Sequence, residues 1–224
     1  MWVVRCRRML PAAVQVLLAL ALVAIETTGV AAQDEPPPIG RFVLDVRGTF
    51  PPFPQDLQLA DSRGLNTREL PGRGLGLDAG AHVYLFRWKA ITFGLGGQLT
   101  VGRARFTPPV ERADSFRSVT ERFTSFSPQL SFNFGDGNGW SYISGGVGGV
   151  VWSILPDSGA PGPADEETLR AFNYGGGARW FAKPHLAFSF DVRLHAIDPG
   201  TPYLGRPGSP RTLLLIIGAG VSIK

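Results

Sequence analysis

Alternation between apolar and polar positions recurs along most of the chain and predicts a protein built from β-strands. In the stretch 186–195 (LAFSFDVRLH), leucine, phenylalanine and valine side chains face one way, while Asp191, Arg193 and His195 face the other. A period of two residues is the signature of a strand with two chemically different faces. The same alternation occurs in the stretches 40–50, 74–86, 90–102, 126–134 and 170–181.

Two further stretches complete the series but are less regular. Residues 140–154 can be placed with Tyr142, Val150 and Trp152 outward, or with Ile143, Val147 and Val151 outward, and the pattern does not decide between them. The last stretch, 212–224, is apolar on both faces at first and then alternates. With both included, the sequence predicts eight strands and almost no helix.

The lengths of the connections alternate as regularly as the side chains do. The long connections cover about 51–73, 106–121, 155–167 and 198–211, and the short ones cover 87–89, 135–139 and 182–184. An even number of antiparallel strands, with short turns on one rim and long loops on the other, is typical of bacterial outer-membrane barrels. The sequence therefore predicts an all-β fold, an eight-stranded antiparallel up-and-down transmembrane β-barrel.

A soluble barrel also alternates, so the orientation of the apolar face needs separate evidence. Small residues crowd the polar face, as at Gly94, Gly96, Gly175 and Gly177, which suits a narrow interior filled with side chains. The predicted strands also reach the 9–11 residues that a tilted strand needs to cross a bilayer. Both features favour an apolar face directed toward lipid.

The tryptophans add a third argument for a membrane. Trp88, Trp140 and Trp180 all fall at or beside the short turns, and Trp152 falls toward the opposite rim. Indole rings prefer the level at which hydrocarbon meets headgroups. We therefore expect these four residues to form membrane-interface belts.

The first part of the chain differs from the rest. A basic start with Arg5, Arg7 and Arg8 precedes an apolar run over 10–25, and small residues follow up to Ala32. This order predicts a secretory signal peptide over 1–32, a Pro-rich lead over 33–39 and a barrel domain over 40–224. Cleavage would remove the single cysteine and leave 19 basic against 17 acidic residues, so no nucleic-acid-binding surface is expected.

The predicted signal peptide, the eight strands, and the segments NYGGGARWF (173–181) and KPHLAFSFDVR (183–193) together resemble the small bacterial outer-membrane barrels of the OmpA/OmpX type. The resemblance implies export to the outer membrane, insertion by the outer-membrane assembly machinery, contact with outer-membrane lipid and lipopolysaccharide, and a monomeric state. Such barrels usually end on an aromatic residue, whereas this chain ends on Ile223 and Lys224.

The polar face of the strands predicts an internal network of salt bridges and hydrogen bonds, because charges persist in a crowded interior only when they are paired. A narrow ion path gated by Arg–Asp pairs is the functional alternative. The residues expected in this network are Asp45, Arg47, Asp78, His82, Gln98, Asn133, Asn173, Arg179, Asp191, Arg193 and His195.

Catalytic and metal chemistry have little support in the sequence. His195 is the only histidine expected near the long-loop rim, and no serine follows a histidine at the spacing of a lipid A deacylase. Three dispersed histidines form no metal motif, and a calcium site from Asp157, Asp165, Glu166 and Glu167 is less favoured than a solvated acidic loop. We expect no cofactor, no metal and no catalytic residue.

The long loops carry both charges together with Phe53, Leu57 and Phe116, which we expect to be exposed and available for binding. A structural or adhesive role follows as the main expectation. Three alternatives remain open at this point: a narrow ion or small-solute pore, a lipid A-modifying enzyme, and a soluble periplasmic barrel like a lipocalin.

Overall fold

The computed structural model describes residues 36–157 and 165–224. The predicted signal peptide (1–32), residues 33–35 of the predicted Pro-rich lead and part of the third long loop lie outside the described residues. The remainder of the chain, from Pro36 to Lys224, is one compact unit.

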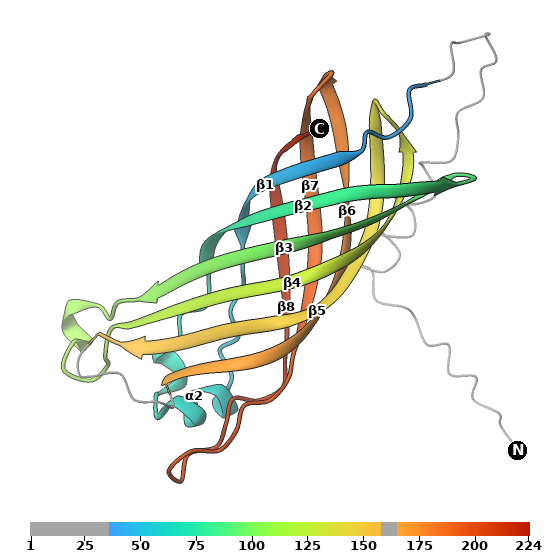
Figure 1. Cartoon of the computed structure of the whole chain (residues 1–224). Coiled ribbons are helices and arrows are strands. Elements are labelled where there is room, and N and C mark those ends of the chain that lie inside the picture. Colours follow the sequence, from blue (N-terminus) through green and yellow to red (C-terminus); the bar gives the residue numbers. More distant parts are fainter. Residues whose placement is uncertain (1–35, 158–164) are drawn as a thin grey trace, which may run out of the picture. The chain divides into compact units, whose positions relative to one another are not determined.

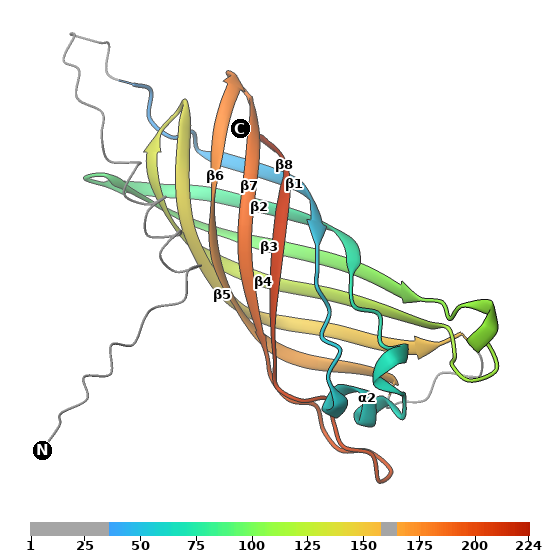
Figure 2. The same ribbon diagram turned by 180° about the vertical axis from the view of Figure 1, so that it is seen from behind.

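Eight strands form a closed ring in which every strand pairs antiparallel with its neighbours in sequence (Figure 1). They are β1 (Phe42–Phe50), β2 (Gly74–Trp88), β3 (Ile91–Phe106), β4 (Val119–Asp136), β5 (Gly139–Pro156), β6 (Glu166–Lys183), β7 (Leu186–Ile197) and β8 (Thr212–Ile223). The first and last strands close the ring, with pairs running from Leu44 and Ile223 to Phe50 and Ile217 (Figure 2). The predicted up-and-down barrel is confirmed.

Strands β4, β5 and β6 each contain 18 residues, which is longer than the alternation predicted. The additional pairs lie at the long-loop rim, for example between Val119 of β4 and Pro156 of β5. Cross-strand hydrogen bonding continues there, although the alternation of apolar and polar residues stops. The alternation stops because a largely apolar interior replaces the polar one at this level.

The first long connection contains two short helices that alternation did not predict. They are α2 (Leu57–Arg63) and η1 (Thr67–Glu69), and both lie at the long-loop rim (Figure 1). The Asp56 side chain accepts a hydrogen bond from the backbone of Leu59 and begins α2, and Gly64, with φ of 62°, ends it. A third short helix, η2 (Val110–Arg112), lies in the second long connection.

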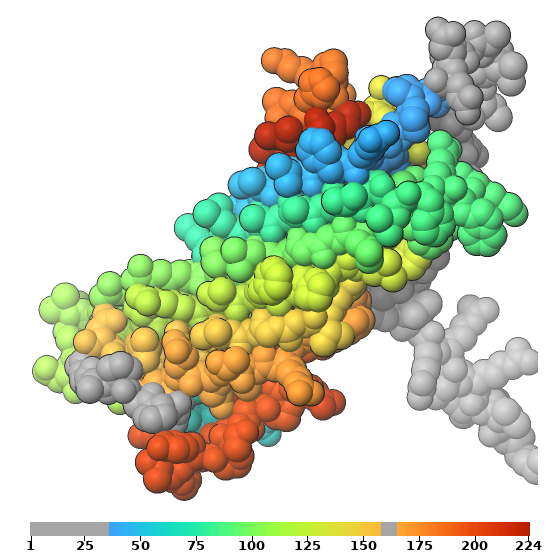
Figure 3. Space-filling view, viewed as in Figure 1, coloured from blue at the N-terminus to red at the C-terminus, as the bar shows by residue number. Residues whose placement is uncertain are grey.

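The outer surface of the barrel is apolar over most of its height. Leu75 is 68% exposed, Phe126 60% and Phe188 70%, although all three are paired in register with a neighbouring strand. Figure 3 shows the face formed by β2 to β5. In water such a surface would be unfavourable, at roughly 25 cal/mol for each Å² of apolar area.

The structure decides the orientation of the stretch 140–154, which the sequence left open. Ile143, Val147 and Val151 face outward, and Tyr142 and Trp152 are buried inside. The reason is hydrogen bonding, since the Tyr142 hydroxyl donates to Asp191 and the Trp152 indole donates to Glu121. A lipid-facing position would leave both groups without partners.

Inward-facing glycines make room for large interior side chains. A Cβ atom at Gly96 would lie 2.6 Å from the His82 ring, and one at Gly177 would lie 2.7 Å from the Tyr142 hydroxyl oxygen. These contacts explain why small residues occupy the polar face of β3 and β6. Within the described part of the chain, no helix is both long and apolar enough to cross a membrane.

Candidate functional site

The interior of the barrel holds all the residues expected in the polar network. Each of the eleven side chains is at most 5% exposed, in contrast to the apolar residues that alternate with them on the outside. The set comprises Asp45, Arg47, Asp78, His82, Gln98, Asn133, Asn173, Arg179, Asp191, Arg193 and His195.

Asp45 is the acceptor at the short-turn end of this network. Arg179 donates two hydrogen bonds to its carboxylate, from Nε at 2.8 Å and from Nη2 at 2.6 Å. Arg47 lies 2.9 Å from the same carboxylate, and the Ser222 hydroxyl donates to it. The paired, two-pronged geometry with Arg179 is the strongest form of arginine–carboxylate contact.

Arg47 connects Asp45 to the next carboxylate along the barrel axis. It donates to Asp78 at 2.8 Å and to the Tyr142 hydroxyl at 3.1 Å. Asp78 also accepts hydrogen bonds from Gln98 and Thr100. Both oxygens of this buried carboxylate therefore accept at least one hydrogen bond, which compensates for its removal from water.

Tyr142 links Arg47 to the third acid, because its hydroxyl donates to Asp191 at 2.6 Å. Arg193 contacts both oxygens of Asp191 at 3.1 Å and donates to Ser144 at 2.8 Å. Its remaining nitrogen donates to Gln129, which in turn donates to Asn173.

The charges of this network balance. Three aspartates (Asp45, Asp78 and Asp191) face three arginines (Arg47, Arg179 and Arg193), and each arginine is joined to at least one aspartate. A cavity of only about 10 Å³ remains among these groups. Space of that size holds about one water molecule, so the network fills the interior at this level.

Three other members of the network, Asn133, His82 and His195, have polar side-chain atoms without a hydrogen-bond partner among the described residues. The Asn133 amide donates to Ser131 and to the backbone of Thr92. Among the described residues, the ring nitrogens of His82 and His195 have no hydrogen-bond partner. The His195 ring lies edge-on against Phe123, with centroids 5.4 Å apart. His195 therefore lies in an aromatic environment and has no serine or carboxylate hydrogen-bonded to it.

At the short-turn rim, a group of aromatic rings closes the interior beneath the polar network. Trp140 is 3% exposed and stacks on Phe181, with Tyr84 edge-on at 5.9 Å. Its predicted place in a membrane-interface belt is therefore wrong, because β5 turns it inward. Trp88 and Trp180 are 61% and 59% exposed and lie on the outer surface.

The last residue of the chain takes part in this aromatic group. The Lys224 ammonium lies 3.9 Å from the centroid of the Phe181 ring and donates to the backbone oxygen of Gly137. Its backbone N–H bonds to the oxygen of His185. Burial against the rings lowers the pKa of Lys224, and the nearby charge of Asp136 partly offsets this effect. The chain end is thus held to the rim by several contacts.

At the long-loop rim the interior is largely apolar, with a few buried polar groups such as Glu121. The first long loop folds inward and places Phe53, Leu59, Ala60, Leu65 and Leu70 in one cluster with inward-facing residues of β3 to β8. We refer to these five residues as the loop 1 plug. Phe53 is 4% exposed and packs edge-on against Phe123 at 6.5 Å, so its predicted exposure is wrong. Leu57 on the same loop is 66% exposed.

Trp152 belongs to the same apolar cluster and is completely buried. Its predicted place in a membrane-interface belt is therefore also wrong. The indole N–H donates to Glu121 at 2.8 Å, and Glu121 is itself completely buried. A polar partner on β4 thus draws the ring inside, because an indole and a carboxyl removed from water each need a hydrogen bond.

Ion pairs join the loop 1 plug to its surroundings. Arg63 of α2 donates to Glu167 of β6 at 2.7 Å. Glu69 of η1 accepts hydrogen bonds from the backbone and side chain of Arg117 and from the backbone of Asn66. Burial alone would raise the pKa of the Glu69 carboxyl, but these donors outweigh it and hold the pKa below its usual value.

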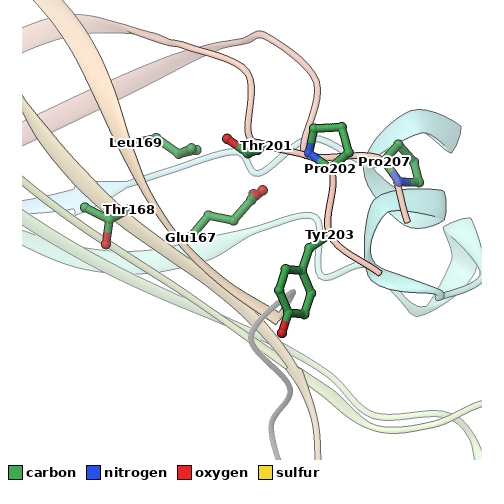
Figure 4. A pocket seen from close by; sticks show the side chains of 7 residues that line it. All are labelled: Glu167, Thr168, Leu169, Thr201, Pro202, Tyr203 and Pro207. Carbon is green, nitrogen blue, oxygen red and sulfur yellow. The ribbon is translucent and has the colours of Figure 1, made fainter. Parts of the chain in front are cut away.

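A surface pocket of about 230 Å³ lies where β6 meets the loop 198–211 (Figure 4). Glu167, Thr168, Thr201 and Tyr203 line it together with two prolines. Glu167 is already engaged by Arg63 and by the backbone of Ser209, so this carboxylate holds two loops together.

Metal-binding chemistry has no visible centre in the described residues, where no group of three acidic or histidine side chains converges. Of the acidic residues considered for calcium, Asp157 pairs with Arg105 and Glu167 pairs with Arg63. The segment between them, 158–164, lies outside the described residues.

Sequence reasoning missed several residues that organise the interior. The inward orientation of Tyr142 and Glu121 could not be predicted, because neither the stretch 140–154 nor the start of β4 has a clear alternation. Arg63 and the loop 1 plug were missed because an apolar loop residue can equally well be exposed. One signal was present, since leucines at 57, 59, 65 and 70 are unusually many for a solvated loop.

Comparison with known proteins finds similar solved structures but no related sequence. No family model and no curated sequence matches the chain. Among solved structures, Neisserial surface protein A is 12% identical, with a TM-score of 0.49 over 82% of this chain and 96% of that one. The attachment invasion locus protein Ail of Yersinia pestis is 14% identical, with a TM-score of 0.46 over 83% and 99%.

The N-terminal barrel domain of Pseudomonas aeruginosa OprF is 12% identical, with a TM-score of 0.42 over 82% of this chain and 96% of that domain. These are similarities of fold. The closed ring of eight antiparallel strands by itself has the up-and-down barrel topology that the sequence predicted.

Proposed function

We propose that this protein is an integral outer-membrane barrel with a closed interior, which serves a structural or adhesive role through its surface loops. The observation that carries the proposal is the inverted distribution of side chains. Charged residues such as Asp45 and Arg179 are buried, while aliphatic and aromatic residues cover the outside. This arrangement is favourable only in hydrocarbon, where the apolar outer face contacts lipid instead of water. The closed ring also suits this surrounding, because it leaves no backbone group of the strands unpaired within lipid.

Three consecutive layers support a closed interior. From the short-turn rim they are the aromatic group around Trp140, the balanced Asp–Arg network and the loop 1 plug. A pore would need a continuous polar path, but the plug is apolar and the network leaves space for about one water molecule. We therefore favour a non-conducting barrel over a small-solute pore.

The interior location of His195 argues against lipid modification at this residue. Its side chain is 1% exposed and packs against Phe123 inside the barrel. A lipid substrate outside the barrel could not reach it, since a catalytic base must lie within hydrogen-bond distance of the proton that it removes. Expression of the protein should leave the mass of lipid A unchanged.

Exposed apolar residues at the long-loop rim support the adhesive part of the proposal. Leu204 is 85% exposed and Tyr203 45% exposed at the tip of the loop 198–211, and Val110 is 90% exposed on the second long loop. Apolar residues at loop tips of a rigid scaffold are suited to protein or surface contacts.

The proposal is tested in two steps with the full-length protein expressed in a Gram-negative host. The protein should require detergent for extraction from outer-membrane fractions and should migrate differently on a gel with and without boiling. Extraction in buffer alone would refute the membrane location. Purified protein in planar bilayers should then show no single-channel currents, whereas regular current steps would refute the closed interior and favour a pore.

A further inference from the structure

Two outward-facing arginines at the long-loop rim lie directly opposite each other on neighbouring strands. Arg103 of β3 and Arg122 of β4 are register partners, and both are exposed. Like charges directly across a strand pair destabilise a sheet. Within the described residues, neither guanidinium has a hydrogen bond or an ion pair to a protein group. Pairing with other residues of the protein therefore does not offset the repulsion between these two arginines.

The nearby acidic groups do not compensate for this pair. Asp157 is occupied by Arg105 at 2.6 Å and by the Thr120 hydroxyl. Glu166 lies two strands away from Arg122, with Ser153 of β5 between them in the register. Glu121, the sequence neighbour of Arg122, is buried inside the barrel. The positive charge of the pair thus faces outward without a matching carboxylate.

A groove of about 440 Å³ lies directly beside the two arginines on the outer surface of β2 to β4. Leu75, Leu77 and Val101 form its apolar part, and Arg103, Arg122 and Thr124 form its polar part. Val101 and Arg103 lie two positions apart on one strand face, so apolar and cationic groups are separated by roughly 7 Å. The leucines are 68% and 58% exposed and continue the apolar band of the barrel.

We propose that this groove binds a phosphate-bearing lipid of the outer leaflet, with its phosphate between Arg103 and Arg122 and an acyl chain along Leu75, Leu77 and Val101. The inference rests on the proposed membrane location. A phosphate accepts hydrogen bonds from two guanidinium groups at once, which removes their mutual repulsion. The apolar half of the groove lies in the lipid-facing band, where an acyl chain is the natural neighbour and a soluble partner is not.

The test measures lipid retention by native mass spectrometry of the purified barrel in a nonionic detergent. The probes are diphosphoryl lipid A and the same lipid with both phosphates removed. Wild-type protein should retain the phosphorylated probe at least about tenfold better than the other. The double variant Arg103→Ala/Arg122→Ala should lose this preference to within about twofold.

Arg170→Ala provides the matched control, because Arg170 is another exposed, outward-facing arginine but lies on β6 away from the groove. Its retention of the phosphorylated probe should equal that of the wild type. Equal loss in this control, or equal retention of both probes by the wild type, would overturn the proposal in favour of unspecific charge or apolar adsorption.

Heat-modifiable gel migration of each variant separates failure of the site from failure of the barrel. Wild-type protein that is not heat-modifiable would contradict the membrane barrel itself, whereas a folded barrel without phosphate preference would contradict the lipid site alone. If the double variant does not fold, Arg103→Gln and Arg122→Gln are tested singly. Each should weaken retention of the phosphorylated lipid by roughly threefold, and unchanged retention in both would overturn the site.

Discussion

Arg179 and Asp45, 134 positions apart in the sequence, are joined by two hydrogen bonds of 2.8 and 2.6 Å across the barrel interior. Their strands, β6 and β1, are not neighbours in the ring. The contact therefore ties together parts of the wall that no strand pairing connects, at a depth where both side chains are 1% exposed.

Loss of this buried contact should destabilise the barrel strongly. The variant Arg179→Ala leaves the Asp45 carboxylate with fewer donors, and breaking a buried ion pair from one side costs about 3–5 kcal/mol. The measurement is a urea titration of the refolded protein in micelles, followed by gel migration without boiling. Arg211→Ala is the control, since Arg211 pairs with Asp198 at 3.7 Å on the surface and should cost at most about 1 kcal/mol. Equal effects of both substitutions would contradict a structural role for the network.

The tryptophans should divide into two classes by their contact with lipid. Trp88 and Trp180 are exposed on the outer surface, whereas Trp140 and Trp152 are buried inside. In barrels that keep one of these tryptophans at a time, lipids brominated along the acyl chain should quench Trp88 and Trp180 at least about twofold more than the other two, because quenching needs close approach to lipid. Strong quenching of Trp152 would place that side chain outside the barrel.

Docking of the loop 1 plug should depend on pH through Glu69. The folded-state pKa of this carboxyl is below its unfolded value, so the stabilisation is complete above the unfolded pKa and is lost as the pH falls through the lowered folded pKa. Docking should thus persist through mildly acidic conditions and weaken only below the usual range of glutamate. Hydrogen exchange of residues 57–70 measures this loss, and Glu69→Gln should exchange faster at neutral pH and lack the acidic transition.

The three interior layers should act as independent barriers to ions. Leu59 and Leu70 are completely buried in the plug, and Leu59→Ser/Leu70→Ser should release it because buried leucines lost to small residues cost about 2–5 kcal/mol each. Proteolysis of the first long loop should become faster, while planar bilayers remain silent because the Asp–Arg network stays in place. Ion currents should arise only when Arg193→Ala and Trp140→Ala are both added, because the aromatic group around Trp140 also closes the interior. Conduction by the plug variant alone would show that the network does not close the interior.

The sequence by itself determined the wall of the barrel. A period of two residues requires opposite faces for Phe190 and Asp191, and the alternation of long and short connections requires antiparallel neighbours. These are local rules, so they predicted the eight strands, the outward apolar face and the eleven buried polar residues without knowledge of any distant contact.

Only the tertiary structure decided what fills the two ends of the barrel. Trp140 and Trp152 lie near strand ends, like the exposed Trp88 and Trp180. They nevertheless face inward, because Trp140 stacks on Phe181 and the Trp152 indole donates to Glu121. Phe53 is buried because a loop folds back into the apolar end of the interior. Such positions depend on contacts between residues far apart in the chain, and local alternation contains no information about those contacts.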